Sequence, residues 1–331
     1  MTKYSDCGVI FVATDPQFLM EAEQAARTVG TCCPDISTTL FTSLETDSTV
    51  FKTIKEISDP KDGFADKVEN LRRSPYERSI YLDGDIYVHD SDGIYDIFDM
   101  LERFDIVGSH ALMRTVNRDG PLGFYQEDIP DSFPLINGGL IGYRNSDEAK
   151  ATLSRWENKY RRDVEKKAGT DDQPSLRAAI YEGEAQFAAL PPEYNFRIPY
   201  KQLLIDDVKI FHGRATNLAE LAERVNSAEC LGKARLYVPI FAGRQGPGGQ
   251  FVHVTPIMNP RKGEVQFRRV IKSIREHGFG PTLLYLLLGG VNPGYTRVHK
   301  TKEIFVSDGP VETAKEVGRW VAGQIRRINS R

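Results

Sequence analysis

The chain has 331 residues, of which 40% are hydrophobic and 27% are charged. These fractions are ordinary for a globular protein and exclude a disordered or fibrous chain, while the length allows one large domain or two unequal ones. The net charge of −3 argues against a dedicated nucleic-acid-binding protein.

The cysteines and the apolar stretches indicate a cytoplasmic protein. Only four cysteines occur, two of them adjacent, and no C-x-x-C pair points to a disulfide framework or a zinc site. The first residues lack the apolar core of a signal peptide. The longest apolar stretch, 283–288, is far shorter than the roughly 20 residues that span a bilayer.

Strand patterns alternate with helix patterns from the start of the chain. Residues 8–14 form a continuous apolar run, typical of a strand covered on both faces, and a helix is expected to begin at Pro16 with Asp15 as its N-cap. The other expected strands are 36–42, 79–82, 104–109, 135–143 and 208–213. The other expected helices are 64–71, 94–101, 147–163 (polar and exposed), 172–181 and 217–226. This alternation predicts an α/β fold with a mainly parallel twisted sheet flanked by helices.

Two carboxylates, Asp83 and Asp85, follow the expected strand at 79–82 and flank one glycine. In open α/β sheets, ligands collect at the carboxyl ends of the strands. Both carboxylates can reach one cation only if the backbone turns, which Gly84 permits. Because two like charges this close repel each other, a divalent ion such as Mg²⁺ or Mn²⁺ that bridges substrate phosphates would stabilise the pair.

The same tripeptide fits two other interpretations. It could be a turn without a ligand, because Asp-Gly-Asp is common where a chain reverses. It could also belong to an aspartyl phosphatase, with Asp83 as nucleophile and Asp85 as acid/base. Two observations count against the phosphatase: Tyr87 stands where such enzymes usually have Thr or Val, and the pair comes late in the chain.

Five short segments, in this order, make the chain resemble the GT-A glycosyltransferases. They are Val-Ile-Phe-Val-Ala-Thr-Asp at 9–15, Tyr-Leu-Asp-Gly-Asp-Ile at 81–86, Ile-Asn-Gly-Gly-Leu-Ile-Gly-Tyr at 136–143, Asp-Asp-Gln at 171–173 and Ile-Phe-His-Gly at 210–213. The set is most similar to family 8, the retaining group that includes glycogenin and the bacterial lipooligosaccharide galactosyltransferases. The resemblance implies the GT-A nucleotide-diphospho-sugar transferase fold for a catalytic domain over residues 1–230.

The resemblance also implies roles for individual residues. The nucleotide-sugar donor would be held by Ala13, Thr14, Asp15, Lys67, Asp83, Asn137, Gly138, Gly139 and Arg214. Within that set, 13–15 would contact uracil and ribose, Lys67 would face the diphosphate and 137–139 would line the sugar. Mn²⁺ or Mg²⁺ would be ligated by Asp83, Asp85 and His212, and a mixed carboxylate and imidazole set suits Mn²⁺ better. Asp172 and Gln173 would be the catalytic residues beside the anomeric carbon.

Three positions depart from the family pattern or have an alternative explanation. The usual His-x-x-Gly-x-x-Lys ending is reduced to His212-Gly213-Arg214, so the phosphate-binding lysine is missing and Arg214 is its expected substitute. Pro174 follows the Asp-Gln pair, where the family usually has aspartate or glycine. Asp172 could also be the N-cap of the helix that follows it.

The activity that the resemblance implies is metal-dependent transfer of a hexose from UDP-hexose to an acceptor hydroxyl, with retention of configuration. The acceptor could be a glycan, a lipid-linked glycan, a small molecule or a protein. Besides the phosphatase, two alternatives stay open. One is a sugar nucleotidyltransferase, which normally needs a glycine-rich basic loop after the first strand that this chain lacks. The other is a catalytically silent scaffold with the same fold.

The end of the chain carries none of these motifs and differs in charge. Residues 255–331 contain 14 Lys and Arg against 6 Asp and Glu, whereas the rest of the chain contains 29 against 40. We expect 231–331 to be a basic C-terminal extension that packs on the catalytic domain. The alternative is docking to an acceptor or to an anionic membrane surface, which would make the protein peripheral to the membrane.

Overall fold

The computed structural model describes residues 3–61, 64–111, 129–165, 171–215, 217–227, 235–240 and 251–256. The predicted extension beyond residue 256 lies outside the described residues. None of the helices within these ranges has the length and apolar character of a membrane-spanning segment.

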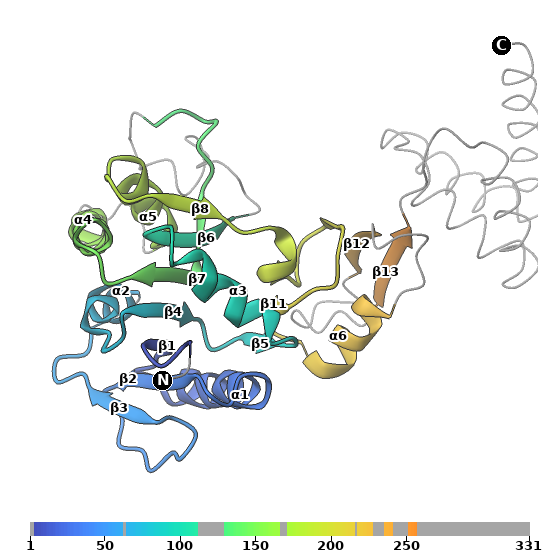
Figure 1. The fold of residues 1–331 in the computed structure, drawn as a ribbon, viewed down its shortest axis with the longest axis horizontal. Coiled ribbons are helices and arrows are strands. Elements are labelled where there is room, and N and C mark those ends of the chain that lie inside the picture. The colour runs from blue at the N-terminus through green and yellow to red at the C-terminus, as the bar shows by residue number, and fades with distance from the viewer. Residues whose placement is uncertain are drawn as a thin grey trace, which may run out of the picture. The chain divides into compact units, whose positions relative to one another are not determined.

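A seven-stranded sheet forms the centre of the fold (Figure 1). Its strands, in spatial order, are β3 (Thr53–Glu56), β2 (Ser37–Thr42), β1 (Cys7–Val12), β4 (Arg78–Leu82), β7 (Ile136–Arg144), β6 (Ile106–His110) and β8 (Phe187–Ala189). All neighbours pair in parallel except β7, which runs antiparallel to both β4 and β6. The α/β fold class and the mainly parallel sheet are therefore confirmed.

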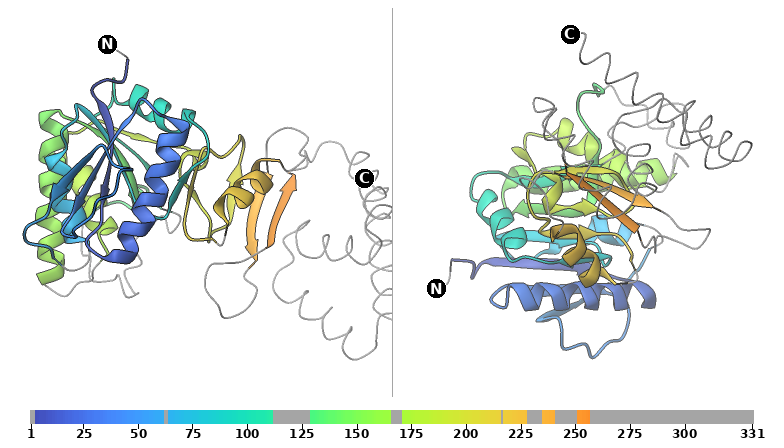
Figure 2. Two further views of the ribbon diagram at one scale, coloured as in Figure 1. Left: turned by 90° about the horizontal axis from the view of Figure 1, so that it is seen from below. Right: turned by 90° about the vertical axis from the view of Figure 1, so that its right-hand side faces the viewer.

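Helices cover both faces of this sheet (Figure 2). The central strand explains why, because Val9 and Phe11 pack into one core and Ile10 packs into the other, all fully buried. One core is closed by α1 (Pro16–Cys32) and α3 (Asp92–Met100). The other is closed by α2 (Ala65–Asn70), the 3-10 turn Leu71–Arg73, α4 (Asp147–Glu165) and α5 (Gln173–Tyr181). A strand with apolar side chains on both faces requires this arrangement.

The start of α1 is as predicted. Pro16 is its first residue, and Asp15 Oδ1 accepts a hydrogen bond of 2.8 Å from the backbone N–H of Gln17. The carboxylate thus satisfies one of the backbone donors that a helix leaves unpaired at its N-terminus.

The prediction that the helix at 147–163 is polar and exposed is wrong. One face of α4 is buried, and Trp156 on that face is fully enclosed. The buried apolar side chains recur at steps of three and four residues, at Ala149, Leu153, Trp156 and Tyr160. That spacing is the helical signature of a core-facing stripe, which the many charges on the opposite face obscured.

Two smaller sheets follow the central one. The first contains β5 (Ile86–Val88), β11 (Ile210–His212) and β9 (Phe196–Arg197). The second contains β10 (Gln202–Leu204), β12 (Arg235–Ile240) and β13 (Phe251–Pro256), so the strands that follow position 230 pair with a strand that precedes it. The helix α6 (Leu218–Asn226) shares a third apolar core with these segments. A 3-10 turn, Pro192–Tyr194, precedes β9.

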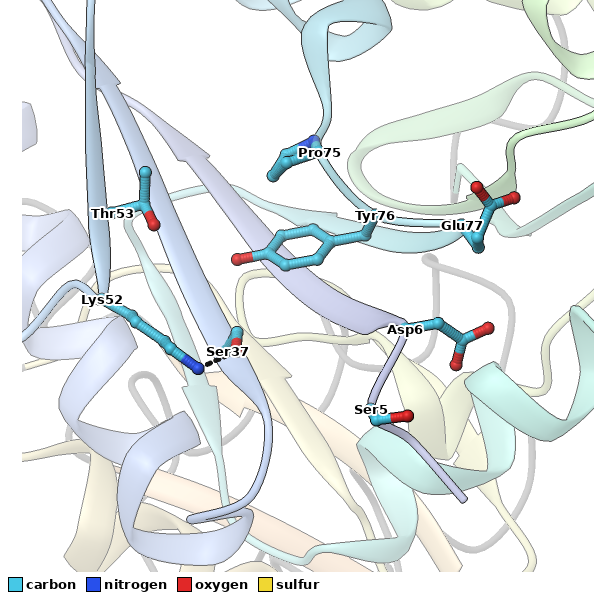
Figure 3. Close-up of a pocket in the computed structure, with 8 residues that line it drawn as sticks. All are labelled: Ser5, Asp6, Ser37, Lys52, Thr53, Pro75, Tyr76 and Glu77. Carbon is cyan, nitrogen blue, oxygen red and sulfur yellow. Dashed lines mark hydrogen bonds between the residues drawn. The ribbon is translucent and has the colours of Figure 1, made fainter. Parts of the chain in front are cut away.

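A cavity of about 360 Å³ lies at the amino ends of β1 to β4 (Figure 3). Its charged lining residues already have polar partners: Lys52 Nζ donates to Ser37 Oγ at 3.2 Å, and Asp6 forms an ion pair with Arg78 at 2.9 Å. Asp83 and Asp85 follow the carboxyl end of β4, at the opposite edge of the sheet. This cavity is therefore not the site that the motifs predict.

Candidate active site and metal-binding group

The Asp83-Gly84-Asp85 turn directly follows β4. The backbone turns at residues 84–85 as predicted, but Gly84 does so without a positive φ, which among the glycines of the described part of the chain only Gly213 has. A Cβ on Gly84 would instead lie 2.9 Å from the backbone nitrogen of Ala22 in α1. Glycine is therefore needed here for the close approach of the turn to helix α1.

The reversed strand β7 brings its amino end to the same edge of the sheet. Leu82 pairs with Leu140, and the N–H of Asp83 donates to the carbonyl of Gly139 at 2.8 Å. The Asn-Gly-Gly segment and the acidic pair are therefore neighbours because β7 is antiparallel to β4. A parallel strand would have placed its first residues at the far edge.

His212 joins the acidic pair through the small sheet. In the antiparallel pairing of β11 with β5, His212 lies opposite Ile86, the residue after Asp85. Its Nε2 lies 3.4 Å from Asp85 Oδ1 and 3.8 Å from Asp83 Oδ2. One potential ligand atom from each of the three residues lies within 4.8 Å of the other two. This group could hold a metal ion.

Asn195 orients the imidazole. Its Nδ2 donates to Ser109 Oγ at 2.6 Å and to Asn137 Oδ1 at 3.0 Å, which leaves its Oδ1 as an acceptor 2.7 Å from His212 Nδ1. Nδ1 therefore carries a proton, and Nε2 is the ring nitrogen that faces both carboxylates. Metal-binding histidines usually have a partner of this kind on the second ring nitrogen.

The space between these groups exists because position 139 has no side chain. A Cβ on Gly139 would lie 2.4 Å from Asp83 Oδ2 and 2.3 Å from His212 Cε1. Two carboxylates and one imidazole around a gap of this kind suit a divalent cation that accepts both oxygen and nitrogen ligands. The described residues therefore fit the Mn²⁺ or Mg²⁺ that the family resemblance implies.

The charges around Asp85 keep it ionised. Burial alone would raise the pKa of its carboxyl, but the contact with His212 and the positive charges of Arg214 and Arg197 outweigh burial and lower the pKa to about 2. Asp83 is hydrogen-bonded on its other oxygen, because the hydroxyl of Tyr81 donates to Oδ1 at 2.6 Å. Oδ2 of Asp83 stays directed at His212.

A buried ion pair lies next to the metal-binding group. Lys67 Nζ is 2.5 Å from Asp172 Oδ2 and donates to the carbonyl of Gly138 at 3.3 Å, and both charged side chains are almost fully enclosed. Burial disfavours the ammonium, yet Asp172 and Asp83 raise the pKa of Lys67. Three aromatic rings surround the ammonium, those of Phe64, Tyr81 and Trp156. Such rings stabilise a desolvated cation.

Asp172 does not cap α5 with its side chain. It occupies the N-cap position, but the N–H of Gln173 donates to Asp171 Oδ1 at 3.0 Å, and the carboxylate of Asp172 is bound to Lys67 instead. Gly138 allows this arrangement, because a Cβ there would lie 2.8 Å from Asp172 Oδ2. The Asn-Gly-Gly segment thus separates the ion pair from the metal-binding group.

The remaining predicted residues lie around this centre. Ala13 is buried at the end of β1, where its N–H donates to the carbonyl of Phe41, and Thr14 contacts Asp66. Arg214 is engaged by Glu21 of α1, to which its Nε and Nη2 donate at 2.7 and 2.8 Å. Arg214 therefore lies at the rim of the site, and two of its guanidinium nitrogens are already hydrogen-bonded to the Glu21 carboxylate.

Sequence reasoning missed three residues that contact the predicted ones: Tyr81, Asn195 and Arg197. Tyr81 precedes Asp83 by two positions, so an extended chain places both on one face, and that spacing was available in the sequence. Asn195 directly follows a three-residue 3-10 turn, and Arg197 ends a two-residue strand. Segments that short have no periodic pattern to detect.

No protein-family model and no curated protein matches the sequence. Solved structures similar to the chain include an active-site mutant of LgtC and the galactosyltransferase LgtC with donor and acceptor sugar analogues. Both are 15% identical to this chain in sequence, with a TM-score of 0.45. Each similarity covers 66% of this chain, and it covers 94% of the mutant LgtC chain and 93% of the LgtC chain with the sugar analogues. The glycosyltransferase GlyE of Streptococcus pneumoniae TIGR4 is similar over 66% of this chain and 60% of its own, with 13% identity and a TM-score of 0.46. These TM-scores are below 0.5, so the function of the chain has to be inferred from the geometry of its own site.

Proposed function

We propose that the protein is a metal-dependent GT-A glycosyltransferase that transfers a hexose from a UDP-sugar to an acceptor hydroxyl. One observation carries the proposal: Asp83, Asp85 and His212, far apart in sequence, converge at the carboxyl edge of a mainly parallel sheet. In sheets of this kind, that edge is where ligands bind.

The acidic pair and His212 would hold Mn²⁺ or Mg²⁺. A divalent cation bound there would neutralise the charge that develops on a departing diphosphate. The protein's own contribution is orientation: Tyr81 and Asn195 fix one oxygen of Asp83 and one nitrogen of His212, and so direct the other atoms inward. Preorganised ligands of this kind avoid the cost of ordering at the moment of reaction.

The donor would lie along the same edge. Ala13, Thr14 and Asp15 follow β1, beside β4 in the sheet, and would contact uracil and ribose. The segment 137–139 would line the sugar, because two glycines let a sugar ring approach the backbone closely. Asp172 and Gln173 would lie near the anomeric carbon. In this arrangement Lys67 holds the Asp172 carboxylate in place.

The proposed reaction retains the configuration of the sugar, because the acceptor hydroxyl would attack the anomeric carbon on the face from which UDP leaves. The identity of the acceptor, beyond its hydroxyl group, is left open.

The test is UDP release from a panel of UDP-sugars with Mn²⁺, comparing the wild type, Asp85→Ala and Asp47→Ala. Asp47 is an exposed carboxylate in a loop and serves as the matched control. We expect release by the wild type and by the control, and loss of release and of Mn²⁺ binding for Asp85→Ala. Full activity of Asp85→Ala would contradict the metal role.

The competing functions give different results in the same assays. Phosphate release from simple esters without any nucleotide would support the aspartyl phosphatase. Calorimetry that detects neither UDP nor Mn²⁺ binding to the wild type would support the catalytically silent scaffold. Pyrophosphate exchange with a nucleoside triphosphate and a sugar phosphate would support the nucleotidyltransferase.

A further inference from the structure

Arg197 is held in the small sheet beside His212. The two residues are register partners in the parallel pairing of β9 with β11. Gln202 binds both backbone polar atoms of Arg197: its Oε1 accepts from the N–H at 3.4 Å, and its Nε2 donates to the carbonyl at 2.7 Å. The backbone of Arg197 is therefore fixed from two sides, and its side chain starts next to the metal-binding group.

The guanidinium of Arg197 lies against the imidazole. Nη1 is 3.3 Å from His212 Nε2 and 3.4 Å from His212 Nδ1. Nε2 is the nitrogen that faces Asp83 and Asp85, so the positive charge of Arg197 stands at the edge of the group that would hold the metal.

The guanidinium of Arg197 has an N–H donor that makes no hydrogen bond within the described residues. Within the described ranges of the chain, no carboxylate forms an ion pair with its guanidinium, and its Nε is buried without a hydrogen-bond partner. A buried, unsatisfied donor on a charged group is unfavourable, and an incoming anion would relieve it. Arg214 differs in this respect, because Glu21 occupies its fork in bidentate fashion.

We propose that Arg197 is a binding residue for the diphosphate of the donor, in the place of the lysine that the His212-Gly213-Arg214 ending lacks. This inference rests on the proposed function. The guanidinium matches phosphoryl oxygens in charge and in its fork of N–H donors. An anion held beside His212 Nε2 would receive hydrogen bonds from Arg197 while it lies next to the metal-binding group. Arg214 would then make the smaller contribution, since it must first leave Glu21.

The test is calorimetry of the full chain with three probes: UDP with Mn²⁺, uridine with Mn²⁺, and Mn²⁺ alone. Arg197→Gln should weaken UDP binding by about 10- to 100-fold, the equivalent of losing charge-assisted hydrogen bonds. Uridine and Mn²⁺ binding should change little, because neither contains a phosphate. Arg214→Gln should lose less UDP affinity than Arg197→Gln, and Arg162→Gln, an exposed arginine of α4, should match the wild type.

The outcomes separate the two proposals. If the wild type binds neither UDP nor Mn²⁺, the proposed function is wrong and the role of Arg197 falls with it. If the wild type binds UDP with Mn²⁺ but Arg197→Gln binds UDP equally well, or loses UDP and uridine by the same factor, the role of Arg197 alone is wrong. Should Arg197→Gln fail to fold, Arg197→Met decides: methionine keeps an apolar stem but has neither the charge nor the N–H donors, so unchanged UDP affinity overturns the inference.

Discussion

The Nδ1 atom of His212 lies 2.7 Å from Oδ1 of Asn195 in the interior of the protein. Both residues are buried, and Asn195 is held in turn by Ser109 and Asn137. The imidazole can therefore neither rotate nor change its tautomer without breaking this network. A ligand nitrogen that is fixed in this way binds a metal with little loss of side-chain freedom.

Asn195→Ala should weaken Mn²⁺ binding by about 10- to 100-fold, because the loss of such an outer partner lets the histidine ring reorient. Calorimetric titration with Mn²⁺ measures the change. The control is Asn145→Ala, which removes an exposed asparagine bonded to Glu77. Equal Mn²⁺ affinity of Asn195→Ala and the wild type would mean that the hydrogen bond does not orient His212 for a metal.

Gly139→Ala should distort the metal-binding group while leaving the sheet intact. The added Cβ would meet Asp83 Oδ2 at 2.4 Å and His212 Cε1 at 2.3 Å, so both side chains would have to move apart. We expect weaker Mn²⁺ binding and a fall in UDP release of about 100-fold or more, the usual cost of misplacing groups by an ångström.

The matched glycine is Gly30 in α1, where a Cβ would have no atom within 4 Å. Gly30→Ala should leave Mn²⁺ binding unchanged and stabilise the protein by about 0.5–1 kcal/mol, because alanine is the better helix former. Thermal melting and the Mn²⁺ titration measure both effects. The interpretation of position 139 would be wrong if its alanine variant bound Mn²⁺ as well as the Gly30 variant does.

The sequence predicted the parts of the site that have a local pattern. Asp83 follows an apolar run, and His212 ends another, so both could be placed at the ends of buried strands. Their meeting depends on the register of β11 with β5, and β5 has only three residues. Asn195 and Arg197 could not be predicted, because pairings between short segments distant in sequence determine their positions.

Asp105 should make the protein sensitive to acid. Burial would raise the pKa of its carboxyl, but hydrogen bonds from the N–H of Gln186, from Ser146 Oγ and from Arg144 outweigh burial and lower it. Since the folded-state pKa is below the unfolded value, this stabilisation is complete above the ordinary aspartate pKa of 3.8 and is lost as the pH falls through the folded-state value.

Asp105→Asn should therefore lower the free energy of unfolding by about 1–3 kcal/mol at neutral pH, because three donors lose a charged acceptor. It should also flatten the dependence of stability on pH below about 4. Urea denaturation at pH 7 and pH 3 measures both. An unchanged acid dependence in the variant would assign the effect to other carboxylates.

The ion pair of Lys67 and Asp172 should be costly to break from one side and cheaper to remove whole. Lys67→Met leaves the Asp172 carboxylate buried without its counter-charge, and we expect a loss of about 3–5 kcal/mol in the free energy of unfolding. Replacing both residues, as Met and Leu, removes the stranded charge, so the double variant should be more stable than Lys67→Met.

Urea denaturation gives these free energies, with Lys150→Met on the exposed face of α4 as the control for loss of a lysine. The double variant should fold yet release no UDP, because the carboxylate beside the proposed sugar site is gone. A double variant that folds but releases no UDP would show that the ion pair is not needed to hold α2 against α5. It would also show that the charged residues are needed for the reaction. A double variant less stable than Lys67→Met would show instead that the pair is a net stabilising contact of the core.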